Sequence, residues 1–110
     1  MKGDSLTKKD VPKYIREIAQ RLRPVPTKEM TFALYGKWRL GYTRQLEADA
    51  TKLVAWARRH YAEAEILSYH FWWDRFSNKT AASKYGYRNY IVVSITDPVV
   101  WLLEKENFFR

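Results

Sequence analysis

The first strong hydrophobic pattern in the chain lies between residues 11 and 23. Apolar side chains recur there every three or four positions, and Lys, Arg, Glu and Gln fill the positions between them. This spacing is typical of an amphipathic helix, because 3.6 residues make one helical turn. Asp10 is a suitable N-cap, and Pro24 cannot continue a helix. We therefore predict a helix that begins after Asp10 and ends before Pro24.

The pattern over residues 30–42 is ambiguous. Apolar and polar positions alternate from Met30 to Tyr42, and many of them are aromatic. Such alternation favours a strand, or a hairpin bent at Gly36. Met30, Ala33 and Trp38 would also share one face of a helix, so a helical segment remains the alternative.

The rest of the chain has clearer patterns. Helix-like spacing alternates with period-two spacing, and Asp97-Pro98 opens the last element. In chain order the predicted elements are a helix over 43–61, strands over 65–73 and 89–95, and a helix over 99–106. A polar, basic connection over 75–87, with a turn signal at Gly86, joins the two strands.

These elements predict an α+β fold in the order α-β-α-β-β-α. About three strands would form a small antiparallel sheet, with the helices packed on one face. Residues 10–110 would form a single globular domain after a flexible basic arm over 1–9. If residues 28–40 are helical instead, the order becomes that of a winged helix. In that alternative, residues 44–61 would be the recognition helix and residues 75–88 the wing.

The charge of the chain is uneven. The 110 residues include 20 Lys and Arg against 12 Asp and Glu, which gives a net charge of +8. All of this excess lies in residues 1–62, whereas residues 63–110 carry equal numbers of basic and acidic side chains. A basic half of this kind favours an anionic partner, and nucleic acid is the first candidate.

Several kinds of chemistry have no support in the sequence. The chain has no Cys, which removes disulfide scaffolds, zinc ribbons and thiol catalysis. His60 and His70 lack the spacing of metal ligands. Glu63 and Glu65 could share one strand face, but Asp74 is too far along the strand to converge with them unless the strand bends back, so a metal site would need a carboxylate from another element. We therefore expect no enzymatic activity, no metal and no cofactor.

The sequence also gives no sign of membrane association. Residues 89–104 form a long stretch without Lys or Arg, but Asp97 and Pro98 interrupt it and it is shorter than the ~20 apolar residues that a span needs. The first residues are polar and contain no hydrophobic signal segment. We expect a cytoplasmic protein that does not contact a membrane.

The aromatic content suggests a binding surface. A chain with 5 Trp, 8 Tyr and 5 Phe has more rings than a core of this size can bury. Strand parity places some rings and cations on the sheet face that points away from the helices, where rings would stack on bases and cations would contact phosphates. With the basic residues nearby, the candidate nucleic-acid-binding residues are Tyr35, Lys37, Arg39, Arg58, Arg59, His70, Trp72, Lys79, Lys84, Arg88 and Tyr90.

The function predicted from these features is non-enzymatic binding of nucleic acid, with a preference for single-stranded DNA or RNA. One alternative is a small inhibitor or adaptor that docks its aromatic face on an acidic protein partner, because interfaces favour Tyr, Trp and Arg. Another is duplex binding by the winged-helix arrangement. The aromatic face is also a possible homodimer contact.

Overall fold

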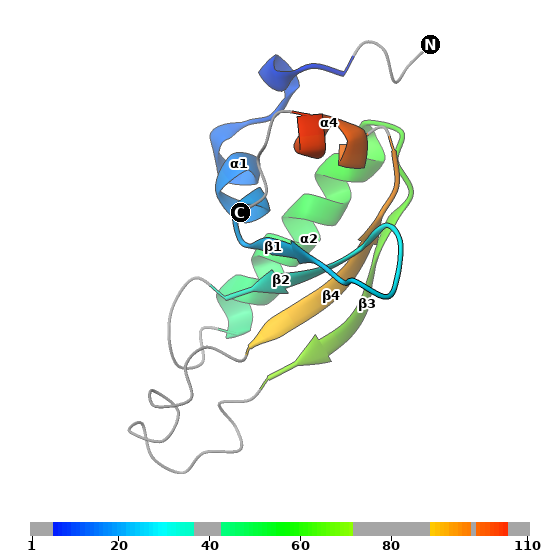
Figure 1. The fold of residues 1–110 in the computed structure, drawn as a ribbon. Helices are drawn as coiled ribbons and strands as arrows, with labels where there is room; N and C mark the ends of the chain where they lie inside the picture. The colour runs from blue at the N-terminus through cyan, green and yellow to red at the C-terminus, as the bar shows by residue number, and fades with distance from the viewer. Residues whose placement is uncertain (1–5, 37–42, 72–88, 98, 106–110) are drawn as a thin grey trace.

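The computed structural model describes residues 6–36, 43–71, 89–97 and 99–105 (Figure 1). Among the described elements the strands come in two consecutive pairs, with one helix between the pairs and others before and after them. In order the elements are η2 (Lys8–Asp10), α1 (Lys13–Ala19), β1 (Leu22–Pro24), β2 (Thr31–Tyr35), α2 (Thr43–Arg59), β3 (Ala64–His70), β4 (Tyr90–Ile95) and α4 (Val99–Lys105).

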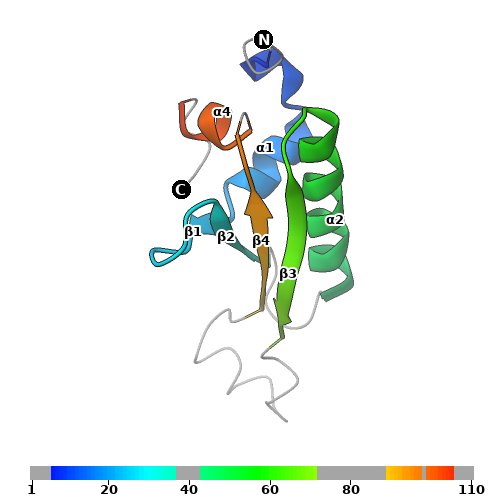
Figure 2. The same cartoon turned by 90° about the vertical axis from the view of Figure 1, so that its right-hand side faces the viewer.

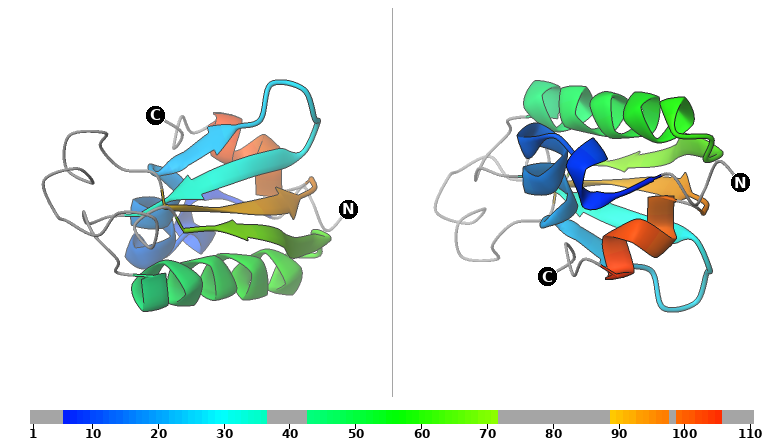
Figure 3. Two further views of the ribbon diagram at one scale, coloured as in Figure 1. Left: turned by 90° about the horizontal axis from the view of Figure 1, so that it is seen from below. Right: turned by 90° about the horizontal axis from the view of Figure 1, so that it is seen from above.

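The strands form one antiparallel sheet in the order β1-β2-β4-β3. Strand β4 is therefore internal, although it comes last in the chain. Viewed from above, α1 and α4 lie in front of the strands, and viewed from below they lie behind them, whereas α2 runs alongside β3 in both views (Figure 3). The predicted α+β class is confirmed, with four strands instead of about three.

The core lies between the sheet and the helices. Figure 2 shows α2 running alongside β3 and β4, with α1 and α4 near the end of the molecule at which β4 ends. Ile91, Val93 and Ile95 of β4 are fully buried, as the alternating pattern predicted. They share one cluster with Leu46 and Leu53 of α2. Within the described residues, no helix combines the length and apolar content needed to cross a bilayer.

The predicted N-terminal helix is too long. Helix α1 ends at Ala19, and Leu22–Pro24 form the short edge strand β1. Leu22 is fully buried and pairs with Leu34. It is apolar because it belongs to the buried face of the sheet, although its position also fits the spacing of the preceding helix. Pro24 is tolerated because an edge strand need not donate all of its backbone N–H groups.

Asp10 does not cap α1, contrary to the prediction. The N-cap of α1 is Pro12, and the Asp10 carboxylate accepts a hydrogen bond of 2.8 Å from the backbone N–H of Thr7. Leu6 is buried, and the Trp56 indole N–H donates to the backbone oxygen of Asp10 at 3.1 Å. Leu6 of the predicted basic arm thus packs on the core, whereas Thr7, Lys8 and Lys9 are exposed. Residues 1–5 lie outside the described part of the chain.

The helical alternative for residues 28–40 is wrong. Residues Thr31–Tyr35 are strand β2, which pairs with β1 on one side and β4 on the other. This double pairing satisfies the backbone hydrogen bonds laterally, which outweighs the helix-like spacing of Met30 and Ala33. The winged-helix arrangement therefore loses its structural basis, and residues 75–88, its wing, lie outside the described residues.

Four side chains that the sequence patterns place on apolar faces are exposed, those of Tyr14, Tyr61, Leu67 and Tyr69. Tyr61 was expected on the apolar face of α2, but the helix ends at Arg59 and the Tyr61 side chain is 62% exposed. Leu67 was expected on the core face of β3, but the register of β3 against β4 shifts between Ile66 and Ser68. This bulge turns Leu67 outward, where it is 45% exposed.

Candidate nucleic-acid interface

Three aromatic rings stack across the open face of the sheet. Tyr90 on β4 lies opposite Tyr35 on β2 and opposite His70 on β3. The ring centroids of Tyr35 and Tyr90 are 5.3 Å apart with an interplanar angle of 20°, and those of His70 and Tyr90 are 4.5 Å apart at 10°. We call this row the ring ladder. It brings together three of the residues selected from the sequence.

The ring ladder changes how these aromatic groups can meet a ligand. Tyr90 is the middle ring, so a neighbouring ring covers each of its faces. An incoming base can stack on the outward face of Tyr35 or of His70, but it meets Tyr90 only at the ring edge. The sequence predicted separate stacking platforms at Tyr35 and Tyr90, and the structure joins them into one wall.

His70 is held in place by a second contact. Its Nε2 atom lies 2.8 Å from the hydroxyl oxygen of Ser68, two residues earlier on the same face of β3. Stacking on Tyr90 and the Ser68 hydrogen bond together fix the plane of the imidazole. The β3 end of the ring ladder is therefore held by two contacts.

A groove lies beside the ring ladder on the same sheet face and has a volume of about 530 Å³. Its floor is made of small or branched side chains, so the sheet surface is shallow there. The β1–β2 loop borders one side, and none of the described lining residues carries a carboxylate. The lining residues are Arg23, Pro24, Val25, Pro26, Lys28, Thr31, Ala33, Tyr35, Leu67, Ser68, Tyr90 and Val92.

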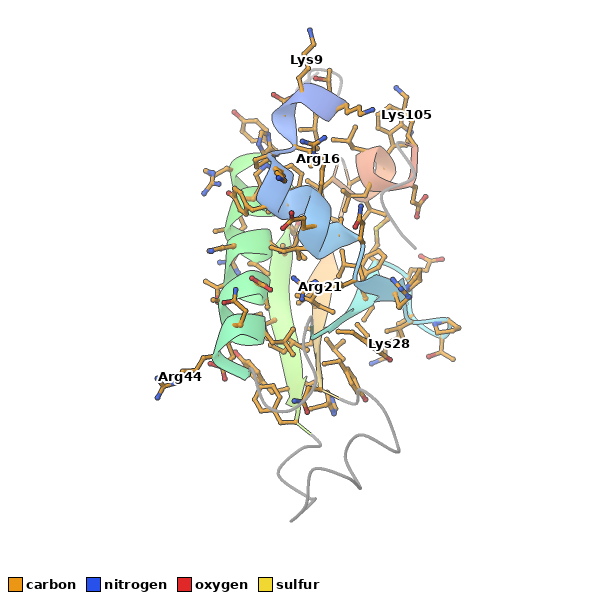
Figure 4. The ribbon with its side chains drawn as sticks, turned by 90° about the vertical axis from the view of Figure 1, so that its left-hand side faces the viewer. Lys9, Arg16, Arg21, Lys28, Arg44 and Lys105 are labelled. Atoms are coloured by element: carbon orange, nitrogen blue, oxygen red, sulfur yellow. The ribbon has the colours of Figure 1, made fainter. Side chains whose placement is uncertain are left out.

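Two cations at this groove were missed in the sequence analysis. The Arg23 guanidinium donates to the backbone oxygens of Gln20 and Leu22, both at 2.8 Å, which fixes its position. Lys28 lies in the exposed β1–β2 loop and lines the groove as well (Figure 4). Arg23 was assigned to the polar face of a helix, and no local pattern indicates that a loop lysine faces a groove.

A buried ion pair supports the Tyr35 end of the ring ladder. The Arg21 guanidinium donates to the Tyr35 backbone oxygen at 3.0 Å and to the Asp49 carboxylate at 2.6 Å. The Gln45 amide donates to the other Asp49 oxygen at 2.9 Å. Asp49 is 94% buried as a residue, since its exposed fraction is 6%. The short acidic side chain next to Ala50 on the apolar stripe of α2 was the available sequence signal for this contact.

Arg58 and Arg59 do not lie at the ring ladder. The Arg58 Nε atom donates to the backbone oxygen of Ala64 at 2.8 Å, at the start of β3. A separate hollow there is lined by Arg58 together with Glu63 and Glu65. His70 lies at the far end of β3, roughly 20 Å away at about 3.3 Å per residue.

The other predicted site residues are not placed. Lys37, Arg39, Trp72, Lys79, Lys84 and Arg88 lie outside the described residues. Among those that the structure describes, no group of three or more His, Asp or Glu side chains is arranged to hold a metal ion. The His60 ring packs against Trp56 at a centroid distance of 5.0 Å.

Comparison with known proteins assigns no function to this surface. No family model, curated protein or solved structure matches this chain. The functional inference therefore rests on the chemistry of the groove and the ring ladder.

Proposed function

We propose that this chain is a non-enzymatic nucleic-acid-binding protein that takes a single strand along the open face of its sheet. The observation that carries the proposal is the groove itself. It combines a wall of stacked rings, a shallow floor and two cations, Arg23 and Lys28. The net charge of +8 supports an anionic ligand.

In the proposed mechanism, the aromatic rings contact the bases and the cations contact the phosphates. An unpaired base stacks on the outward face of Tyr35, a contact worth about 1–3 kcal/mol per base in proteins of this kind. Arg23 and Lys28 contact the phosphates on either side of that base. A duplex already stacks its bases internally, so the groove favours single strands.

The experiment that tests this proposal is an anisotropy titration of a labelled oligo-dT strand and of a matched duplex. We expect the single strand to bind more tightly than the duplex at equal salt concentration.

Replacing Tyr35 by Leu tests the role of the ring ladder. The Tyr35→Leu variant keeps an apolar side chain but removes the stacking face, so we expect about tenfold weaker binding of oligo-dT. Tyr69→Leu is the matched control, because Tyr69 is 54% exposed on the same sheet but projects from the other side of β3. Equal losses in the two variants, or a duplex bound as tightly as the single strand, would contradict the proposal.

A second function is favoured by one observation. Leu67 and Tyr69 are both large and exposed on β3, which is an edge strand of the sheet. Exposed apolar groups beside a strand edge that pairs with no other described strand suit a protein partner that adds a strand. If neither oligonucleotide binds, the second function is tested by isolating the protein with its partners after nuclease treatment. A stoichiometric protein partner that binds the natural chain but not the Leu67→Ser variant would favour this second function.

A further inference from the structure

A second basic surface lies at the end of the molecule that carries η2. A hollow of about 590 Å³ is lined there by Thr7, Lys8, Lys9, Val11 and Arg16. Three of these five residues are cations, and they come from two elements, η2 and α1. Figure 4 shows Lys9 and Arg16 at this end and Lys28 well separated from them. We call this hollow the N-terminal basic hollow.

Its three cations lack carboxylate partners among the described residues. Asp10 is the neighbouring acid in the sequence, but its carboxylate accepts from the Thr7 N–H at 2.8 Å and from the Thr7 hydroxyl at 3.3 Å. The Asp10 charge offsets one of the three positive charges of Lys8, Lys9 and Arg16, so a positive excess remains at this turn. An anion in the hollow would be attracted by that excess.

The hollow is built on a fixed backbone. Leu6 and Val11, which flank η2, are both buried in the core. The Trp56 indole N–H holds the Asp10 backbone oxygen at 3.1 Å and so ties η2 to α2. An anion would therefore meet a turn that is already ordered, and binding would cost little backbone entropy.

We propose that the N-terminal basic hollow binds phosphate groups. Lys and Arg donate charge-assisted hydrogen bonds to phosphate oxygens. A phosphate group, single or linked to a second one, is an anion that suits the three cations of the hollow. This inference does not depend on the groove, because the two surfaces share no residue.

The test uses inorganic pyrophosphate, titrated into the ¹⁵N-labelled full chain and followed by amide chemical shifts. We expect saturable shifts at the amides of η2 and Arg16. The variant with Lys8→Gln and Lys9→Gln, and separately Arg16→Gln, should weaken binding about tenfold or more, since each loses charge-assisted bonds. Arg44→Gln, which removes an exposed cation from α2, should leave the affinity unchanged.

Two further measurements, oligo-dT binding by the same variants and its competition by pyrophosphate, identify the source of the phosphate. If the hollow variants also weaken oligo-dT binding, and pyrophosphate displaces the strand, the phosphates belong to a nucleic acid that reaches this end of the molecule. If oligo-dT binding is unchanged in these variants, the hollow takes a separate phosphorylated ligand. Both results support the site, whether or not the groove binds a strand.

Two results would overturn the inference. One is the absence of saturable shifts in η2 up to millimolar pyrophosphate. The other is an equal response to sodium chloride at matched ionic strength, which would indicate general screening of the lysines instead of a phosphate site.

Discussion

Tyr61 adopts a backbone conformation that is costly for a residue with a Cβ atom. Its φ angle is 67°, in the left-handed region. The Tyr61 N–H donates to the Arg58 oxygen and the Ala62 N–H to the Ala57 oxygen, both at 3.1 Å. This pair of bonds is the Schellman arrangement that ends many helices, and its left-handed position usually holds Gly. The C-terminus of α2 is thus well satisfied but strained at one residue.

Replacing Tyr61 by Gly should stabilise the protein. Removal of the Cβ atom relieves the left-handed strain, and we expect the free energy of unfolding to rise by about 1 kcal/mol in urea titrations. Tyr61→Ala is the control, because it removes the ring but keeps the Cβ atom. If the Ala variant gains as much as the Gly variant, the strain is not the cause.

At the scale of elements, Arg21 connects three parts of the fold. It follows α1, it pairs with Asp49 on α2, and it donates to the last residue of β2, Tyr35. The Arg21 and Asp49 side chains are only 17% and 8% exposed. The position of the ring ladder relative to α2 therefore depends on a shielded ion pair.

Removing one partner of this pair should be costly. Asp49→Ala leaves the Arg21 guanidinium shielded and without its carboxylate, so we expect a loss of about 3 kcal/mol in the free energy of unfolding. The double variant Arg21→Met, Asp49→Leu should lose less, because no unpaired charge remains. Thermal and urea unfolding of both variants measure this difference. A double variant that is less stable than Asp49→Ala would contradict the assignment.

Local patterns predicted the elements that have a single strong periodicity. The stripe of α2 and the alternation of Ile91, Val93 and Ile95 both followed from the sequence. Strand β1 did not, because Leu22 also fits the spacing of the preceding helix and three residues are too few to show a period. The outward turn of Leu67 depends on a bulge, which is set by pairing with β4 and has no local signature.

The candidate site was predictable in part. Strand parity placed Tyr35, His70 and Tyr90 on one face, and the structure agrees. Their stacking on one another depends on the register of three strands that are distant in sequence, so no local pattern predicts it. The two groove cations, Arg23 and Lys28, were missed for the same reason, because the β1–β2 pairing decides where they lie.

At the scale of the whole molecule, the basic excess of residues 1–62 is distributed over several surfaces. Arg23 and Lys28 border the groove, Lys8, Lys9 and Arg16 surround the N-terminal basic hollow, and other cations decorate α2. Net charge alone therefore attracts polyanions to many parts of the surface. Single charge removals separate a specific phosphate contact from this general attraction.

Lys28→Gln and Arg44→Gln form such a matched pair, since each removes one exposed cation and Figure 4 shows the two on different sides of the molecule. For oligo-dT binding, we expect Lys28→Gln to reduce the slope of log K against log salt concentration by about 0.7, the value for one phosphate contact to a single strand. Arg44→Gln should leave the slope unchanged. Equal slopes in the two variants would place the strand elsewhere.

The strand order β1-β2-β4-β3 has a consequence for when the groove exists. Strand β2 reaches its neighbour β4 only after the chain has passed through α2 and β3. A β3–β4 pair by itself would bring His70 next to Tyr90, but Tyr35 and the floor of the groove come with β2. Closing that long loop carries the larger entropic cost. A nascent or partly folded chain therefore has no groove, and binding at this face is restricted to molecules that have completed their folding.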